Sequence, residues 1–138
     1  MTKKKIIHKI AAIVVEDNKF LMVRKVGKDI WTDLGGKPEP GETEEETLVR
    51  EIKEELNCGT KIIRKLGDVT AKAIFDDATL LLSTYLVELI GVPEISDPEL
   101  EEFAFIGADY EKKRIKLPPS VIDGVIPLCQ KEKLLNWR

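Results

Sequence analysis

One segment of the chain carries a full set of helix signals and limits the folds that the chain can adopt. Thr43 followed by Glu46 is the pattern of a capping box, which closes the first turn of a helix. Asn57 stands where this helix would stop, because asparagine tolerates the left-handed backbone that ends helices. Apolar residues recur at helical spacing and predict one buried stripe of Leu48, Val49, Ile52 and Leu56. Stretch 37–41 contains two prolines and a glycine, so we expect a loop leading into the helix.

Strand-like segments lie on both sides of this helix. The expected strands span residues 10–15, 20–26, 61–75, 79–89 and 103–106. Asp17-Asn18 has the composition of a hairpin turn, and 120–135 predicts a second helix. Within that helix, Pro127 should introduce a kink or begin the regular part, because proline lacks the amide donor. The order strands, helix, strands, helix predicts an α/β sandwich with a mixed sheet, formed by residues 1–138 as a single domain.

Charge and hydropathy restrict the class of partner. The formal net charge is −3, whereas proteins that bind nucleic acid without regard to sequence generally carry a basic stripe. No stretch approaches the roughly 20 apolar residues that a membrane-spanning helix needs, and the basic start lacks the apolar core of a signal peptide. We therefore expect a cytoplasmic enzyme that binds neither a nucleic-acid polymer nor a membrane.

Acidic residues are concentrated on the first helix, where seven of the 25 fall between positions 42 and 55. Glu51, Glu54 and Glu55 are spaced i, i+3 and i+4, so they share one face of the helix. Neighbouring like charges destabilise a helix by a few tenths of a kcal/mol per exposed pair, roughly, and a divalent cation removes that cost. Hard oxygen ligands select Mg²⁺, Mn²⁺ or Ca²⁺. A glutamate-rich face on its own is more often plain solvated surface, so the surrounding spacing decides.

That spacing resembles the Nudix box, which is Gly, five residues, Glu, seven residues, then Arg-Glu-aliphatic-any-Glu-Glu-any-Gly-aliphatic. Residues 36–58 read GKPEPGETEEETLVREIKEELNC, and Gly35 and Lys37 flank its first glycine as in the family. Asn57 replaces the second glycine of the box, and Leu34 stands where many relatives have proline. Because asparagine tolerates a left-handed helix end, we expect the geometry of the box to survive.

The resemblance implies a Nudix α/β/α sandwich with a central mixed sheet, in which the box forms a loop-helix-loop that holds Mg²⁺, with Mn²⁺ as a substitute. Carried over position by position, it makes Glu54 and Glu55 metal ligands, assisted by the carbonyl of Gly35 or Gly36. Glu51 would hold a further metal ion or help to activate water.

Other residues of the box are expected to orient these groups and to meet the substrate. Arg50 would orient the carboxylates through charge-assisted hydrogen bonds, and Glu42 would brace the loop against the helix. Gly36 and Lys37, at the start of the box, are expected to contact the substrate.

Outside the box, the family often supplies a further base from a loop. Glu102 stands where relatives commonly carry such a glutamate, with Glu99 and Glu101 as competitors. Arg24 matches a substrate-contacting arginine of MutT-type enzymes, although an exposed strand end would explain it equally well.

The end of the chain bears on the substrate. Residues 117–120 resemble the segment leading into the last helix of MutT-type enzymes, in which an asparagine reads oxidised guanine. Val121 occupies the matching position here and Asp123 is the nearest polar residue, which argues against that specificity.

The resemblance therefore implies hydrolysis of a diphosphate linkage in a small nucleoside polyphosphate. The leading hypothesis is a nucleoside triphosphate pyrophosphohydrolase that releases a monophosphate and pyrophosphate. The alternatives are a hydrolase of ADP-ribose, nucleotide sugars or dinucleoside polyphosphates, and a non-catalytic nucleotide-sensing domain. Homodimers are common in the family, but no interface is evident in the sequence.

Overall fold

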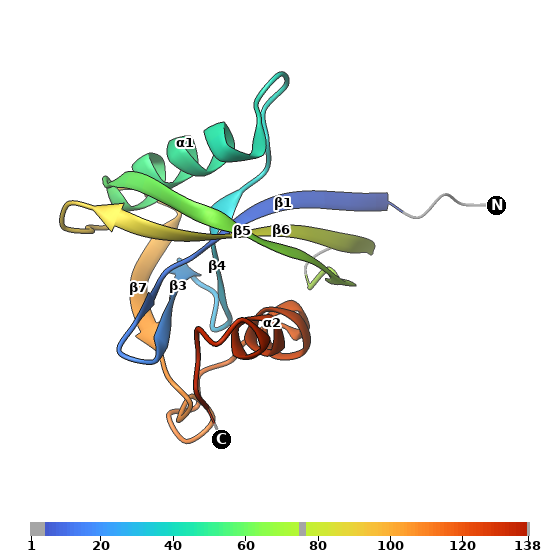
Figure 1. Ribbon diagram of the computed structural model, residues 1–138, viewed down its shortest axis with the longest axis vertical. Coiled ribbons are helices and arrows are strands. Elements are labelled where there is room, and N and C mark those ends of the chain that lie inside the picture. Colours follow the sequence, from blue (N-terminus) through green and yellow to red (C-terminus); the bar gives the residue numbers. More distant parts are fainter. Residues whose placement is uncertain (1–4, 75–76, 138) are drawn as a thin grey trace.

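A curled mixed sheet forms the centre of the computed structural model, which describes residues 5–74 and 77–137 (Figure 1). The strands are β1 (Lys5–Ile13), β2 (Val15–Glu16), β3 (Lys19–Lys25), β4 (Trp31–Gly36), β5 (Gly59–Lys72), β6 (Ala78–Ile90) and β7 (Leu100–Ile106). Their order is β2-β3-β4-β1-β6-β5, and β7 pairs with β3 off this path. β1 runs parallel to β6, whereas it is antiparallel to β4, so the predicted mixed sheet is confirmed.

Helices cover both faces of this sheet. Helix α1 (Glu44–Leu56) lies on one face, and the π-helical turn η1 (Val121–Val125) continues into α2 (Ile126–Lys131) on the other (Figure 1). Alternate residues of β1 divide between the two layers, because successive side chains of a strand point to opposite faces. Ile10 belongs to the apolar cluster beneath α1, and Ala11 belongs to the cluster beneath α2. The α/β/α sandwich expected from the sequence is therefore confirmed.

The caps of α1 are those that its sequence predicts. The Thr43 hydroxyl accepts a hydrogen bond from the amide of Glu46, and the Glu46 carboxylate accepts one from the amide of Thr43. Asn57 ends the helix in the left-handed conformation, with φ of 53°. Leu48, Ile52 and Leu56 are fully buried as expected.

Val49 was expected in the buried stripe, and this expectation is wrong. Its side chain is 47% exposed, because it lies about 100° beyond Leu48 around the helix, past the margin of the sheet. Glu55 is buried instead, on the other margin of the stripe. The helix is therefore rotated so that a carboxylate, rather than a valine, faces the interior.

Strand β4 was not among the strands expected from the sequence. The remaining elements differ from expectation mainly at their ends. Asp17 and Asn18 form the predicted hairpin turn, both with positive φ. The strand expected over 61–75 begins at Gly59 and ends at Lys72, and its predicted last residue lies outside the described residues. The helix expected over 120–135 is shorter, because its regular part spans only Ile126–Lys131 and Lys133 then takes a positive φ.

Pro127 lies in the first turn of α2. Of the two outcomes predicted for it, a kink or the start of the regular helix, the structure shows the second. Within residues 5–74 and 77–137, none of the helices has the length and apolar character needed to span a membrane.

Candidate active site

Two adjacent glycines join β4 to the loop before α1, and each makes room for a different group. Gly35 has φ of +132°, and a Cβ atom there would overlap the carbonyl oxygen of Ile10 in the neighbouring strand. Its amide donates a hydrogen bond to Oε1 of Glu55 at 2.9 Å. A Cβ atom on Gly36 would come within 2.5 Å of the carboxyl carbon of Glu51. The backbone of β4 therefore lies directly against the acidic face of α1.

Arg50 connects the loop and the acidic face. Its Nε and Nη2 donate to the two carboxylate oxygens of Glu42 at 2.6 and 2.9 Å, and Nη2 also donates to the carbonyl of Lys37 at 3.0 Å. Its Nη1 donates to Glu51 at 2.8 Å and to both oxygens of Glu54 at 3.3 Å. The guanidinium, through its hydrogen bonds, holds the pKa of Glu42 down at about 2. These are the contacts expected of a residue that orients carboxylates.

Glu42 braces the loop as expected. Besides its bonds to Arg50, its Oε1 accepts hydrogen bonds from the amide of Glu39 at 2.8 Å and from the hydroxyl of Thr47 at 3.0 Å. Because all of its contacts are internal to the loop and helix, Glu42 is satisfied without a ligand.

The buried carboxylate of Glu55 is the electrostatic centre of the site. Burial raises its pKa to about 8, with smaller contributions from the negative charges of Glu51, Asp97 and Glu54, and the Gly35 amide opposes the rise. Burial likewise raises the pKa of Glu51, although Arg50 offsets part of that effect. Both groups are thus held where a negative charge is costly, as at many functional sites.

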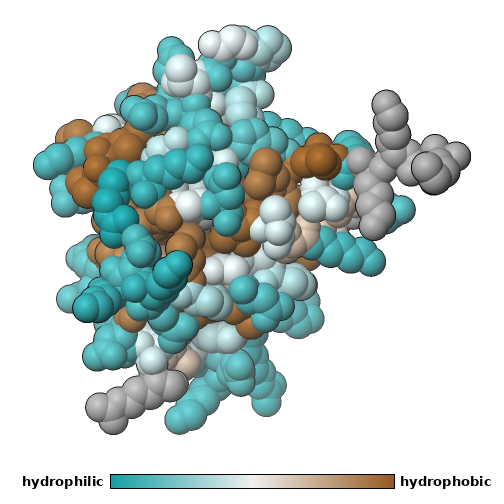
Figure 2. Space-filling view, turned by 45° about the vertical axis from the view of Figure 1, so that its right-hand side comes forward, coloured by the Kyte–Doolittle hydropathy of each residue, from teal (hydrophilic) through white to brown (hydrophobic). Residues whose placement is uncertain are grey.

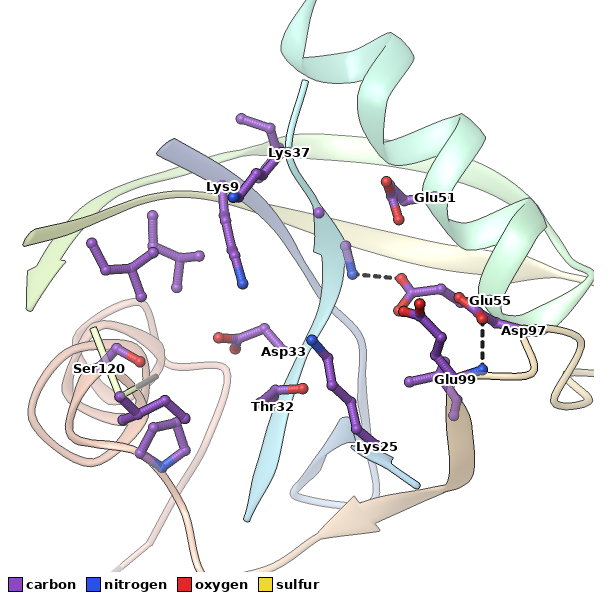
Figure 3. A pocket seen from close by; sticks show the side chains of 18 of the residues that line it. Lys9, Lys25, Thr32, Asp33, Lys37, Glu51, Glu55, Asp97, Glu99 and Ser120 are labelled. Carbon is purple, nitrogen blue, oxygen red and sulfur yellow. Dashed lines mark hydrogen bonds between the residues drawn. The ribbon is translucent and has the colours of Figure 1, made fainter. Parts of the chain in front are cut away.

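These carboxylates line a cavity of about 370 Å³. On the α1 side, its walls include four acidic residues, Glu51, Glu55, Asp97 and Glu99. Lys25 and Lys37 also line it, as do both glycines at the end of β4 (Figure 3). Its volume is within the range of small-molecule sites, roughly 300–1,000 Å³. The cavity therefore combines acidic groups and cationic side chains in a space of ligand size.

The donor set of this cavity suits a divalent cation. Every candidate ligand is a hard oxygen, and the raised pKa of Glu55 reflects burial and repulsion that a cation would relieve. Among residues 5–74 and 77–137, no three acidic, histidine or cysteine side chains are gathered closely enough to hold an ion. Arg50 binds Glu51 and Glu54, while the Gly35 amide binds Glu55. The residues thus fit a metal ion chemically, and their oxygens are engaged by protein donors.

Two residues expected at the site do not line the cavity. Arg24 and Glu102 pair with each other across β3 and β7, with Nε to Oε1 at 3.0 Å. Lys25, the neighbour of Arg24, lines the cavity instead, and Glu99 lines it in place of Glu102. The structure thus places Glu99, rather than Glu102, at the cavity wall, and which of the two acts as the base stays a prediction.

Glu54 also stands apart from the other carboxylates of the helix. Its side chain is 52% exposed and does not line the cavity. Its expected part in holding a metal ion stays a prediction.

Asp97 is a residue of the site that the sequence did not indicate. Ser96 fastens its loop to the end of α1: the Ser96 hydroxyl donates to the carbonyl of Glu54 at 2.7 Å and its amide donates to the carbonyl of Glu55. Asp97 in turn accepts a hydrogen bond from the amide of Glu99 at 2.9 Å (Figure 3). These contacts join segments about forty residues apart, so periodicity in the sequence gives no sign of them.

The C-terminal segment contributes residues other than those expected. Val121 is fully buried in the cluster beneath α2 and cannot reach a ligand. Asp123 does not line the cavity, whereas Pro118 and Ser120 do.

The sequence and the fold are both similar to those of known proteins. The model of the NUDIX domain matches residues 7–119. CTP pyrophosphohydrolase from Escherichia coli (strain K12) is 39% identical over 56 residues, which are 38% of this chain and 42% of that protein. The match thus spans less than half the length of that relative.

Solved structures share the fold over most of the chain. The E. coli ORF135 protein is 26% identical with a TM-score of 0.68, and the match covers 92% of this chain and 88% of that one. The MutT protein from Methanosarcina mazei Go1 is 18% identical with a TM-score of 0.77 and coverage of 96% and 99%. UDP-X diphosphatase is 22% identical with a TM-score of 0.79, and the match covers 96% of this chain and 66% of that one. The last two similarities concern the fold alone.

Proposed function

The chain belongs to the Nudix hydrolase family, and from that premise we propose that it hydrolyses a nucleoside triphosphate to a nucleoside monophosphate and pyrophosphate with Mg²⁺. The observation that carries the proposal is the cavity, whose wall includes buried and half-buried carboxylates together with four lysines. Carboxylates alone would repel a polyphosphate, and lysines alone would only bind it. A cavity with both suits a substrate that arrives with metal ions on its phosphates.

Nudix hydrolases generally use divalent metals, and here Glu51, Glu54 and Glu55, with the carbonyl of Gly35, would hold the ion. A bound Mg²⁺ would neutralise phosphate oxygens and lower the pKa of a water molecule that attacks phosphorus. Mn²⁺, with the same preference for oxygen ligands, is expected to substitute.

The protein side chains have separable tasks in this proposal. The Gly35 amide fixes Glu55, and Arg50 fixes Glu51 and Glu54, so the acidic face is oriented before substrate binds. Lys25 and Lys37 are placed to bind phosphate oxygens. Glu99 lies on the cavity wall and is the candidate for the base outside the box.

The choice of a nucleoside triphosphate rests on two observations. A volume of about 370 Å³ is near the lower end of small-molecule sites and suits one nucleotide better than a dinucleotide. The name of the partly matching E. coli relative, CTP pyrophosphohydrolase, points to the same class of substrate. A cavity of this size in a protein of net charge −3 also favours a small molecule over a nucleic-acid polymer.

A substrate panel with Mg²⁺ tests the proposal. Nucleoside triphosphates, ADP-ribose, a nucleotide sugar and a dinucleoside polyphosphate are incubated with the protein, and the products are identified by chromatography. We expect turnover of a triphosphate to monophosphate and pyrophosphate, lowered by orders of magnitude in Glu55→Gln. Glu45→Gln is the matched control, because Glu45 is an exposed glutamate of the same helix that does not line the cavity. Faster turnover of a sugar or dinucleotide substrate would contradict the choice of substrate, and no turnover of any would favour a sensing domain.

A further inference from the structure

The cavity continues past the carboxylates to a second end, which the chemistry described above does not use. Lys9, Asp33 and Ser120 lie there, on the other side of β4 from Glu51 and Glu55 (Figure 3). Four apolar residues belong to its wall, Ile74, Leu80, Leu82 and Pro118, and the polar residues Thr32 and Lys72 also line the cavity. This end faces the α2 layer, because Leu82 belongs to the cluster beneath α2.

Its apolar wall distinguishes this end from the phosphate end. In the space-filling view, hydrophobic and neutral surface occupies the middle of the face and hydrophilic side chains surround it (Figure 2). Apolar side chains cover the faces of a flat ring well, whereas they cannot satisfy phosphate or ribose oxygens. If the phosphates of a nucleotide lie beside Glu51 and Glu55, the base is the part that reaches this wall.

Asp33 is the exceptional residue of this end. Its Oδ1 atom is buried and accepts no hydrogen bond from any residue within 5–74 and 77–137. A buried carboxylate oxygen without a donor is costly, and an ionised carboxylate can only accept hydrogen bonds. Asp33 is therefore prepared for a ligand that brings an N–H or O–H donor into the apolar end of the cavity.

We propose that Asp33 selects nucleobases that carry an exocyclic amino group, by accepting a hydrogen bond from that group. The inference rests on the proposed function and names the class of base within it. Cytosine, adenine and guanine carry such a group. Uracil presents a carbonyl oxygen in place of the amino group of cytosine, and hypoxanthine presents one in place of the amino group of adenine. That oxygen would face the carboxylate as a second acceptor, and the Asp33 oxygen would stay unsatisfied. Lys9 is close enough for its charge to act on Asp33 and can donate to an acceptor atom of the same base edge.

The test compares nucleotides that differ only at this position of the base. Wild-type protein with Mg²⁺ is assayed with CTP against UTP and with ATP against ITP. We expect kcat/KM to favour the amino-bearing member by about ten- to hundredfold in at least one pair, the range for one hydrogen bond to a charged acceptor.

Asp33→Asn then tests the residue itself. The amide keeps the shape of the side chain but adds a donor, so it should donate a hydrogen bond to the carbonyl oxygen of UTP or ITP. The ratio of kcat/KM values within each pair should then fall at least tenfold, mainly through KM. Asp29→Asn is the matched control, because Asp29 pairs with Lys116 at the surface outside the cavity. The ratio of kcat/KM values in this variant should equal that of the wild-type protein. Calorimetric titration with CMP and UMP gives a readout that is independent of turnover, and urea unfolding confirms that the variants are folded.

The outcomes separate the two proposals. Hydrolysis of none of the four nucleotides would overturn the proposed function, and this inference with it. Hydrolysis of all four at equal efficiency, or an unchanged ratio in a folded Asp33→Asn protein, would overturn the inference alone and leave the proposed function standing.

Discussion

The two adjacent glycines of β4 allow a prediction in which neighbouring substitutions have opposite consequences. In Gly35→Ala, the new side chain must adopt φ of +132° and overlaps the backbone carbonyl of Ile10, which the sheet prevents from moving. A strained backbone costs about 1–3 kcal/mol and an overpacked contact about the same again, so we expect a loss of about 2–6 kcal/mol in the free energy of unfolding. Domains of this kind have a total of only about 5–15 kcal/mol, so the loss is a large part of it.

Gly36→Ala should instead spare stability and damage the site. Its backbone does not require a positive φ, and the new Cβ would meet the far end of the flexible Glu51 side chain. Loss of unfolded-state entropy adds about 0.4–1 kcal/mol of stability, which roughly offsets the displacement of Glu51. We expect an unchanged urea midpoint but at least a tenfold lower turnover, because Glu51 is pushed away from the cavity. Urea unfolding followed by circular dichroism, with initial rates on the same samples, measures both. A Gly35→Ala protein as stable as wild type, or a Gly36→Ala protein with full activity, would refute the reasoning.

Three further predictions follow from the same contacts. In metal-free protein, the free energy of unfolding should fall as pH rises from about 4.5 to about 8, because folded Glu55 keeps a proton that the unfolded chain releases. Urea titrations at several pH values measure this slope, and Glu55→Gln should flatten it. An equal slope in both proteins would contradict the prediction. Asn57→Ala should lower the free energy of unfolding by about 1 kcal/mol, whereas Asn57→Gly should stay near wild type, because position 57 is left-handed; equal thermal midpoints would exclude this. Arg50→Lys loses the paired contacts with Glu42 and should lower the free energy of unfolding in urea by about 1–3 kcal/mol, with a larger fall in turnover. A lysine variant of full activity would show that orientation by Arg50 is unimportant.

Local signals in the sequence were sufficient for the first helix. The capping box at Thr43 and the left-handed end at Asn57 depend only on residues within a few positions, so they could be read directly. Val49 was misplaced because the period of a helix gives the width of an apolar stripe but not which margin the sheet covers. The exposure of Val49 follows from the packing of Glu55 against Gly35, a contact across twenty residues.

The acidic residues outside the box could not be ranked from the sequence. A register shift between Arg24 and Lys25 places Arg24 opposite Glu102 and Lys25 opposite Leu100. This β-bulge decides which side chains of β3 and β7 face the cavity, and nothing in the local sequence marks it. Asp33 was missed for a related reason, because the burial of one carboxylate oxygen depends on strands and a helix distant along the chain.

The most direct test of the account is the fate of CTP at the acidic cavity with and without a divalent cation, followed by ³¹P nuclear magnetic resonance. The account predicts CMP and pyrophosphate when Mg²⁺ is present, no turnover in EDTA, and full recovery when Mg²⁺ is added back in excess. Turnover that persists in EDTA, or release of CDP and inorganic phosphate, would contradict it.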